Sequence, residues 1–281
     1  MKFGVAIFPT DYAISMGELA PVAEDLGFES LWVAEHSHIP TSRLTKWPGG
    51  AELPKHYWHT MDPFIALTVA ALASKTIRVG TGICLVIQRD PIHTAKEVAS
   101  LDVLSKGRFL FGIGAGWNLE EMANHGTTQP EQRGTLLRER IEAMQAIWRE
   151  KQAEYHGKFV DFGPMMTWPK PVQKPYPPIL IGGNFPNGAK RAIAFGDAWM
   201  PHAARPEYAD VVEFLPRFRQ MAAEAGREPD AIPVTVFGAP AEPDRVKRYR
   251  DAGVARICVS LPSEKDDTIL PLLDRWAAMM R

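Results

Sequence analysis

Apolar residues along the chain fall into short runs separated by longer segments of helical character. Several of the runs are apolar on both faces, as buried parallel strands are. We therefore predict eight strands, over residues 3–8, 30–34, 77–87, 108–113, 178–181, 198–200, 232–237 and 255–260. The segments between them predict eight helices, over residues 16–26, 62–74, 93–104, 129–149, 187–194, 206–225, 243–252 and 268–279.

A glycine recurs where a predicted helix passes into a predicted strand, at Gly27, Gly107, Gly196 and Gly253. Glycine closes a helix in a left-handed conformation that other residues enter at a cost. Eight strands that each precede a helix predict a (β/α)8 TIM barrel, here a single domain over residues 1–281. A doubly wound open sheet uses the same units, but eight of them in one chain fit barrel closure better.

Two connections are too long for simple crossovers, residues 35–61 and 150–177. Long loops in a compact domain are often lids or binding loops. We expect one insertion after strand two, on the face where barrel active sites occur, and one before strand five. The second is rich in proline and aromatic residues and should be a stiff excursion.

Composition excludes several classes of function. The chain is 46% hydrophobic and 23% charged, as globular proteins are, and its 32 basic and 33 acidic residues give a net charge of −1. No basic field is present to bind nucleic acid or an anionic membrane, and no apolar run approaches the roughly 20 residues of a membrane span. We expect a soluble, cytoplasmic protein. Cys84 and Cys258 lie in apolar runs, which predicts buried thiols without a disulfide or a metal.

The main ionisable cluster, Glu35, His36 and His38, follows strand two. Histidine has an ordinary pKa of about 6.5 and can accept, donate or orient a proton, so His36 and His38 are candidates for acid/base catalysis. Side chains alternate along a strand end, so only one of Glu35 and His36 should face the barrel axis. The alternative is that one histidine lies in a surface loop and the other only bonds to backbone.

Glycines follow strand four as Gly112-Ile113-Gly114-Ala115-Gly116. This order lacks the third spacing of a dinucleotide-binding fingerprint. Small residues at a barrel rim instead expose backbone amides that can approach a planar ring or a phosphate.

Strand five ends in Gly182-Gly183-Asn184, and a helix begins within a few residues. A helix N-terminus presents free amides and a partial positive charge, so this is the more specific phosphate candidate, with a tight turn as the alternative. Gly82 interrupts a β-branched strand after Thr81, which often marks a bulge or a close approach by a ligand.

Other chemistries have less support. Histidines are numerous, but the chain lacks a His-x-His on strand one, and neither a Gly-x-Ser-x-Gly elbow nor a P-loop occurs. We expect no metal site and no nucleophile. The first long loop contains aromatic residues that either pack over the barrel or line a substrate pocket, and the sequence does not separate these possibilities. They are Trp47, His56, Tyr57, Trp58 and His59.

Several motifs in joint order resemble the bacterial-luciferase-like oxidoreductases. They are Ala34-Glu35-His36, residues 77–82, residues 101–109, Gly112 to Trp117 with Glu121, residues 169–183 and Gly196-Asp197-Ala198-Trp199. Within that superfamily the chain is most similar to the branch of probable coenzyme F420-dependent oxidoreductases. The features concerned are the Gly-Trp after strand four, Arg133 and the proline-rich approach to strand five.

The resemblance implies a barrel that binds coenzyme F420 or FMN at its C-terminal mouth. It implies a non-prolyl cis peptide at Gly82-Ile83 that braces the ring, and a catalytic His36 that contacts the ring and donates a proton. Glu35, next to it at the mouth of strand two, is also predicted to be catalytic. The residues that the resemblance implies in cofactor binding are His36, Thr81, Gly82, Ile83, Gly114, Ala115, Gly116, Gly182, Gly183 and Asn184.

The expected activity is hydride transfer between the deazaflavin F420 and a small, apolar or aromatic organic substrate, by a homodimer. The nearest alternative is an FMN-dependent monooxygenase that uses O2 and reduced flavin from a separate reductase. A non-catalytic flavin-binding barrel and a metal hydrolase are further alternatives. The basic residues with which a sugar-phosphate dehydrogenase of the family holds its substrate have no match here.

Overall fold

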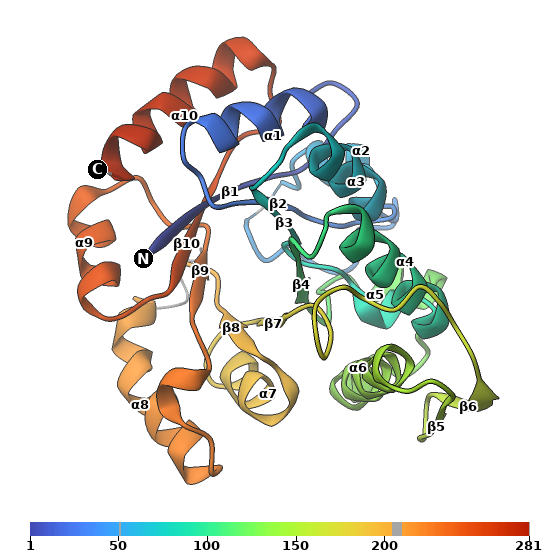
Figure 1. Cartoon of the computed structure of the whole chain (residues 1–281). Coiled ribbons are helices and arrows are strands. Elements are labelled where there is room, and N and C mark those ends of the chain that lie inside the picture. The colour runs from blue at the N-terminus through green and yellow to red at the C-terminus, as the bar shows by residue number, and fades with distance from the viewer. Residues whose placement is uncertain (51, 204–209, 281) are drawn as a thin grey trace.

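Eight parallel strands form a ring in the computed structural model, which describes residues 1–50, 52–203 and 210–280 (Figure 1). Their order in the sheet is β8-β7-β4-β3-β2-β1-β10-β9. Parallel bridges Trp199–Val234 and His202–Phe237 join the two ends of this order, so the predicted barrel is confirmed and the open sheet was wrong. The strands are β1 (Lys2–Ile7), β2 (Ser30–Val33), β3 (Arg78–Thr81), β4 (Phe109–Ile113), β7 (Ile179–Gly182), β8 (Ala198–Met200), β9 (Thr235–Phe237) and β10 (Arg256–Ser260).

Helices surround the ring (Figure 1). Side-chain caps set several of their starts: Ser15 and Glu18 form a reciprocal capping box, and Asp62, Asp90 and Asp210 accept bonds from the amides of a first turn. The helices are α1 (Met16–Asp25), α3 (Pro63–Ala73), α4 (Pro91–Leu104), α6 (Arg133–Arg149), α7 (Asn187–Phe195), α8 (Val211–Glu224), α9 (Pro243–Asp251) and α10 (Asp266–Met280). None in the described ranges is long and apolar enough to cross a membrane.

Apart from shifts of a few residues at several element ends, two features differ from expectation, and one predicted helix start lies outside the described residues. The predicted start of the sixth helix, Pro206, lies outside the described residues, and α8 begins after the cap Asp210. The strand predicted over residues 77–87 ends at Thr81, because the chain turns inward there and its apolar residues continue into the core as a 3-10 turn over Val86–Gln88. Gly196 is extended (φ −100°) rather than left-handed, whereas Gly27, Gly107 and Gly253 have positive φ as expected.

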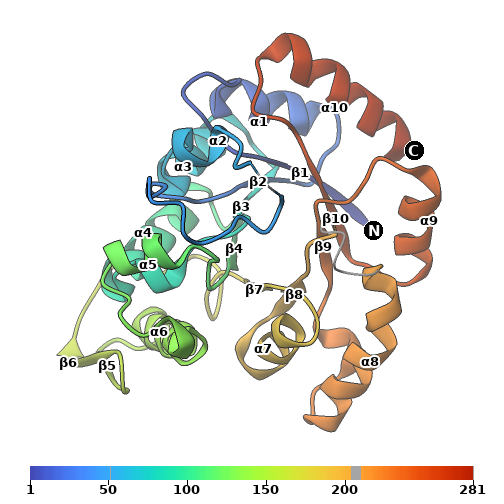
Figure 2. The same ribbon diagram turned by 180° about the vertical axis from the view of Figure 1, so that it is seen from behind.

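Both predicted insertions are present, and each contains elements that the sequence did not predict. The first holds the short helix α2 (His56–His59), and the second holds the antiparallel hairpin β5 (Ala153–His156) and β6 (Asp161–Met165). The hairpin lies at the periphery beside α6 in both ribbon views (Figures 1 and 2). A further short helix, α5 (Leu119–Asn124), follows β4.

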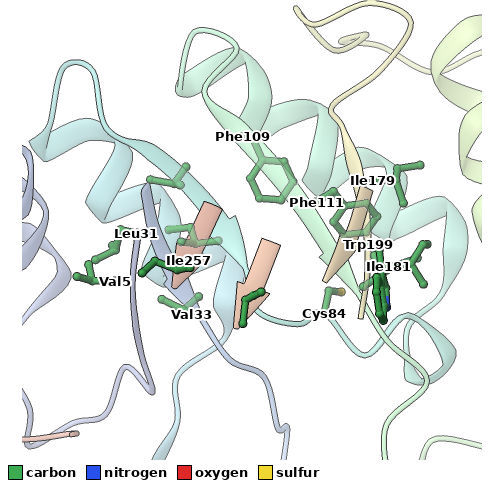
Figure 3. Close-up of a cluster of buried hydrophobic side chains, with 14 of the residues drawn as sticks. Val5, Leu31, Val33, Cys84, Phe109, Phe111, Ile179, Ile181, Trp199 and Ile257 are labelled. Carbon is green, nitrogen blue, oxygen red and sulfur yellow. The ribbon is translucent and has the colours of Figure 1, made fainter. Parts of the chain in front are cut away.

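The core has two layers. The larger one packs strands against helices and includes Val5, Leu31 and Ile257 (Figure 3). The smaller one fills the barrel interior around Trp32, which is completely buried. A Cβ at Gly80 would lie 2.5 Å from the Trp32 ring, so this glycine makes room for the indole. Beyond this filled layer, toward the carboxyl ends of the strands, the described residues enclose open space. Both cysteines, Cys84 and Cys258, are buried as expected.

Candidate active site

A cavity of about 600 Å³ opens at the carboxyl ends of the barrel strands. Ten of the residues predicted from sequence line it: Glu35, His36, Gly82, Ile83, Gly114, Ala115, Gly116, Gly182, Gly183 and Asn184. Thr81 does not. It is completely buried, and its hydroxyl donates to the carbonyl of Gly112 at 2.6 Å, which ties β3 to β4. The role of Thr81 in cofactor binding stays a prediction. The hydrogen bond that the structure shows for its side chain stabilises the sheet.

His36 is buried at the cavity wall, and its two ring nitrogens have different partners. Nδ1 lies 2.7 Å from Oε2 of Glu121, and Nε2 lies 3.2 Å from the indole nitrogen of Trp117. An indole N–H can only donate, so Nε2 of His36 must accept and Nδ1 must hold the proton. His36 is therefore a neutral imidazole that donates to the carboxylate of Glu121.

Glu121 is completely buried on α5, where Asn118 caps the helix by accepting from its backbone amide. Its second oxygen, Oε1, accepts from the backbone amide of Ser37 at 3.1 Å. Burial raises the pKa of Glu121, but the hydrogen bonds that it accepts from His36 and from the Ser37 amide outweigh this effect and hold the pKa below its ordinary value. The pair is thus preorganised as a neutral base next to a fixed negative charge. The sequence showed Glu121 only as part of a motif.

Glu35 belongs to a separate network. Its carboxylate accepts from the backbone amide of Leu85 at 2.6 Å and from Nε of Arg89 at 2.5 Å. Arg89 also pairs with Asp62 at 2.5 Å and Glu97 at 3.0 Å. Glu35 therefore holds the segment that follows β3 in place. Through Arg89 it also connects this segment to Asp62 at the start of α3 and to Glu97 of α4. Its catalytic role stays a prediction.

The Gly82–Ile83 peptide bond is cis, as the resemblance implied. A Cβ at Gly114 would lie 2.2 Å from Cδ1 of Ile83, and one at Gly182 would lie 2.9 Å from its Cγ2. Any larger residue at either position would displace the Ile83 side chain. These two glycines therefore seat Ile83 at the cavity wall, a role that the sequence did not reveal.

Aromatic rings form the wall beside His36. The Tyr57 ring lies 5.2 Å from that of His36 and 5.0 Å from that of His56, and the Phe8 ring lies 4.5 Å from that of His56. Burial lowers the pKa of His56, so its ring is neutral near pH 7. This wall offers stacking surface without a carboxylate or an ammonium group.

The remaining aromatic residues of the first insertion are not among the cavity-lining residues. Trp47 packs edge-on against Tyr57, with the ring centres 5.6 Å apart. Trp58 is 49% exposed, and His59 bonds to Asp11. The open question is thus answered in part: His56 and Tyr57 line the cavity, and Trp47 supports them.

A second side of the cavity, formed by residues of α6 and α7, is basic. Arg133 of α6 and Arg191 of α7 both line it, next to Gly183. Within the described ranges neither arginine pairs with a carboxylate, and Arg191 makes no hydrogen bond. Burial, and then the charge of Arg133, lower the pKa of Arg191. Two uncompensated guanidinium groups are stabilised by an anion placed between them.

Asn184 adds a neutral donor to this side. Its Oδ1 accepts from the backbone amide of His202 at 3.1 Å, while its buried Nδ2 has no hydrogen-bond partner among the described residues. A buried donor without a partner is costly, and a ligand oxygen would satisfy it. The predicted phosphate site therefore lies beside two arginines, of which sequence reasoning missed Arg191 altogether. The described residues contain no group of three or more His, Cys, Asp or Glu side chains that could hold a metal ion.

Comparisons with known proteins agree on one family. The family model described as luciferase-like monooxygenase matches residues 1–263. An uncharacterized protein of Mycobacterium tuberculosis is 37% identical over 100% of this chain and 99% of its own length. The F420-dependent hydroxymycolic acid dehydrogenase of the same organism is 27% identical over 76% of this chain and 55% of its own length.

Solved structures agree on the fold. The monooxygenase RslO1 from Streptomyces bottropensis matches with a TM-score of 0.79 and 20% identity, over 100% of this chain and 98% of that one. The coenzyme F420 dependent tetrahydromethanopterin reductase from Methanopyrus kandleri matches with a TM-score of 0.77 and 21% identity, over 98% and 97%.

Proposed function

The chain belongs to the luciferase-like monooxygenase family, and from this premise we propose that it transfers a hydride between coenzyme F420 and a small organic substrate. Relatives in this family work with F420 or with flavin. The observation on which the proposal rests is the His36–Glu121 pair with its unprotonated Nε2 at the cavity wall. A reaction that moves a hydride from or to a C–O centre also moves a proton, and this pair supplies the site for it.

The basic side of the cavity fits the cofactor's phosphate. Arg133 and Arg191 would balance its charge, and Nδ2 of Asn184 would donate to one of its oxygens. Gly183 has φ +117° and no side chain, so the backbone is open there. The deazaflavin, when bound, supplies or accepts the hydride.

His36 then acts on the proton. A substrate hydroxyl that reaches Nε2 takes the place of the Trp117 indole and gives its proton to the imidazole as the hydride departs. Glu121 stabilises the imidazolium that results, because its carboxylate already accepts from Nδ1. In the opposite direction the imidazolium donates the same proton to the substrate oxygen.

Two further groups position the reactants. Glu35 holds the segment after β3 through the Leu85 amide, and we assign it this positioning role in place of proton transfer. Ile83, seated by its two glycines, would brace the cofactor ring. The aromatic wall of Phe8, His56 and Tyr57 suits an apolar or aromatic substrate without a charge.

Cofactor titration tests the proposal. Purified protein is titrated with F420 and with FMN while fluorescence is followed, and each complex is then offered alcohols, aldehydes and activated alkenes. We expect tighter binding of F420 and turnover of at least one substrate class. Tighter FMN binding with O2-dependent turnover would favour the monooxygenase alternative, and binding without any turnover would favour a non-catalytic barrel.

We also propose that the protein is a homodimer in which α3 contacts a second copy. This helix is apolar on both faces: Ile65, Val69 and Leu72, spaced four and three residues apart, are 67%, 46% and 65% exposed. Helices that are apolar all round are normally buried. Leu72→Glu should convert a dimer to a monomer in light scattering coupled to size exclusion, while Lys75→Glu beside the helix should not. A parent protein that elutes as a monomer contradicts this proposal.

A further inference from the structure

We propose that Ser37 and His125 connect the buried His36–Glu121 pair to solvent and relay protons between them. The inference rests on the proposed function, because it concerns where the proton taken up by His36 goes while the cavity is filled. A continuous row of polar atoms supports it. Oγ of Ser37 lies 3.4 Å from Oε1 of Glu121 and 2.6 Å from Nε2 of His125.

Exposure changes sharply along this row. The side chains of His36 and Glu121 are 6% and 0% exposed. Ser37 and His125 are exposed residues. The carboxylate of Glu121 has no direct access to water, so the Ser37 hydroxyl is the step between the buried pair and the surface. Once a ligand covers Nε2 of His36, the proton on Nδ1 can still pass to its partner Glu121.

Neighbouring groups determine how the Ser37 hydroxyl is used. Nδ2 of Asn124 donates to Nε2 of His38 at 2.8 Å, so His38 has its proton on Nδ1. That proton points to Oγ of Ser37, which lies 2.8 Å away and accepts it. The single hydrogen of Ser37 therefore remains for either Glu121 or His125. A hydroxyl held between two such partners can receive a proton from one while it gives its own to the other.

The proton balance of the outward transfer is as follows. Nε2 of His36 takes the substrate proton, and Nδ1 releases its own proton to Oε2 of Glu121. The carboxyl group turns about its Cγ–Cδ bond and donates to Oγ of Ser37, while the Ser37 hydrogen passes to Nε2 of His125 and then to water. After the product leaves, Nε2 of His36 releases its proton to water in the cavity. Nδ1 regains a proton inward along the same path, which restores the starting tautomer.

Hydrogen exchange of the protein without cofactor gives the first test. Ser37→Ala removes the hydroxyl but keeps the backbone amide that donates to Glu121, and the residue is exposed, so the fold should persist. In protein labelled with ¹⁵N-histidine, NMR reports how fast the Nδ1 proton of His36 exchanges with water. We expect Ser37→Ala to slow this exchange on the order of 10-fold. Unchanged or faster exchange overturns the relay.

Chemical rescue gives the second test. His125→Ala should lower turnover on the order of 10-fold, below the 10²-fold or more typical of a general acid or base itself. Imidazole added to the solution should restore most of the loss, because it replaces the missing ring as proton acceptor. His93→Ala is the matched control: its side chain is 89% exposed on α4, and its turnover should neither fall nor respond to imidazole. A loss in His125→Ala that imidazole leaves unchanged shows a structural role and overturns the relay.

The two tests separate this inference from the proposed function. If the parent fails to turn over with F420 while Ser37→Ala still slows exchange at His36, the proposed activity is wrong and the relay stands. If the parent turns over through His36 while exchange and rescue show no dependence on Ser37 and His125, the relay is wrong and the activity stands.

Discussion

The two sides of the cavity satisfy their polar groups in opposite ways. On the His36 side every ring nitrogen and carboxylate oxygen of the central pair already has a protein partner, from Trp117 through Glu121 to the Ser37 amide. On the α7 side the guanidinium of Arg191 and the Nδ2 of Asn184 are left without partners in the part of the chain that the structure describes.

This difference indicates which side is complete and which awaits a ligand. A fully bonded histidine pair keeps one tautomer and one orientation, which a proton-transfer group needs before substrate arrives. Unpaired buried donors are unfavourable in the free protein, and a bound anion removes that cost. The first side should therefore control turnover, and the second should control cofactor affinity.

The largest expected effect tests the basic side. Replacing Arg133 and Arg191 together by Met should weaken F420 binding by about 10³-fold, because two hydrogen bonds to a charged group are lost at roughly 1.5–3 kcal/mol each. The melting temperature without cofactor should stay equal or rise, since the repulsion between the two guanidinium groups disappears. Fluorescence titration measures the affinity, and differential scanning calorimetry measures the melting.

Arg138→Met is the control for this pair. Arg138 also lies on α6, but it is 52% exposed and pairs with Glu142 at 3.7 Å. Cofactor affinity should not change. If the double variant binds F420 as tightly as the parent, the phosphate lies elsewhere on the rim. The claim that the basic side of the cavity controls cofactor affinity would then be wrong.

The second-largest expected effect concerns the side of the cavity that contains His36. His36→Ala should reduce turnover by about 10²-fold or more, the usual contribution of general acid/base catalysis. The dissociation constant of F420 should change far less, because the polar partners of His36 are Glu121 and Trp117 and not the two arginines proposed to hold the phosphate. Steady-state kinetics with a cofactor titration checks both values. Unchanged turnover with an unchanged pH profile would reduce His36 to a packing role.

Much of the fold could be predicted because its signals are local. The three residues of β8 were predicted to the residue, since a buried run follows a helix that ends in Gly196. Glycines at Gly27, Gly107 and Gly253 have the positive φ that their place after a helix requires. The end of β3 was predicted too late, because apolar residues continue beyond Thr81 and Gly82 was interpreted as a bulge within the strand and not as its end.

The site was harder to predict because its partners are distant in sequence. Glu121 lies 85 residues from His36, on a six-residue helix too short to show helical periodicity. Arg191 occupies one position of an amphipathic helix, where a basic residue usually faces solvent. Gly114 and Gly182 line the cavity and their predicted role in cofactor binding stays a prediction, whereas their contact with Ile83 follows only from the packing.

A smaller effect concerns the backbone between the two arginines. Gly183→Val should weaken F420 binding by about 10-fold, because a side chain there would occupy open space next to Nη1 of Arg191, 4.0 Å from the new Cβ. The substitution should also cost about 1–2 kcal/mol of stability, because a φ of +117° is unfavourable for valine. Binding and melting are measured on the same sample.

Gly226→Val separates these two consequences. Gly226 has φ +73°, and no atom lies within 4 Å of the place that a Cβ would take, so the variant should lose stability in a similar way without any change in affinity. If both variants bind F420 like the parent, Gly183 serves only the turn before α7.

The smallest expected effect concerns the amino-terminal end of the barrel strands, away from the cavity. It tests whether residues there contribute to stability but not to binding or turnover. Glu24 of α1 accepts hydrogen bonds from the backbone amides of Lys75, Thr76 and Ile77, ahead of β3. Although burial raises the pKa of Glu24, these bonds lower it to about 2. Glu24→Gln should therefore cost about 1 kcal/mol at pH 7, a modest value because Glu24 is only half-buried and solvent screens its charge.

The pH dependence of this variant has a definite sign. A carboxylate whose folded pKa is lowered stabilises the protein above its ordinary pKa and loses that contribution as the pH falls through the folded value. The difference in unfolding free energy between parent and Glu24→Gln should thus shrink as the pH falls from about 4.5 toward 2. Urea titrations across that interval measure it, with turnover and F420 affinity at pH 7 as the companion readouts. A change in either readout would mean that the two ends of the barrel are coupled, whereas their constancy would confine cofactor binding and proton transfer to the two sides of the cavity.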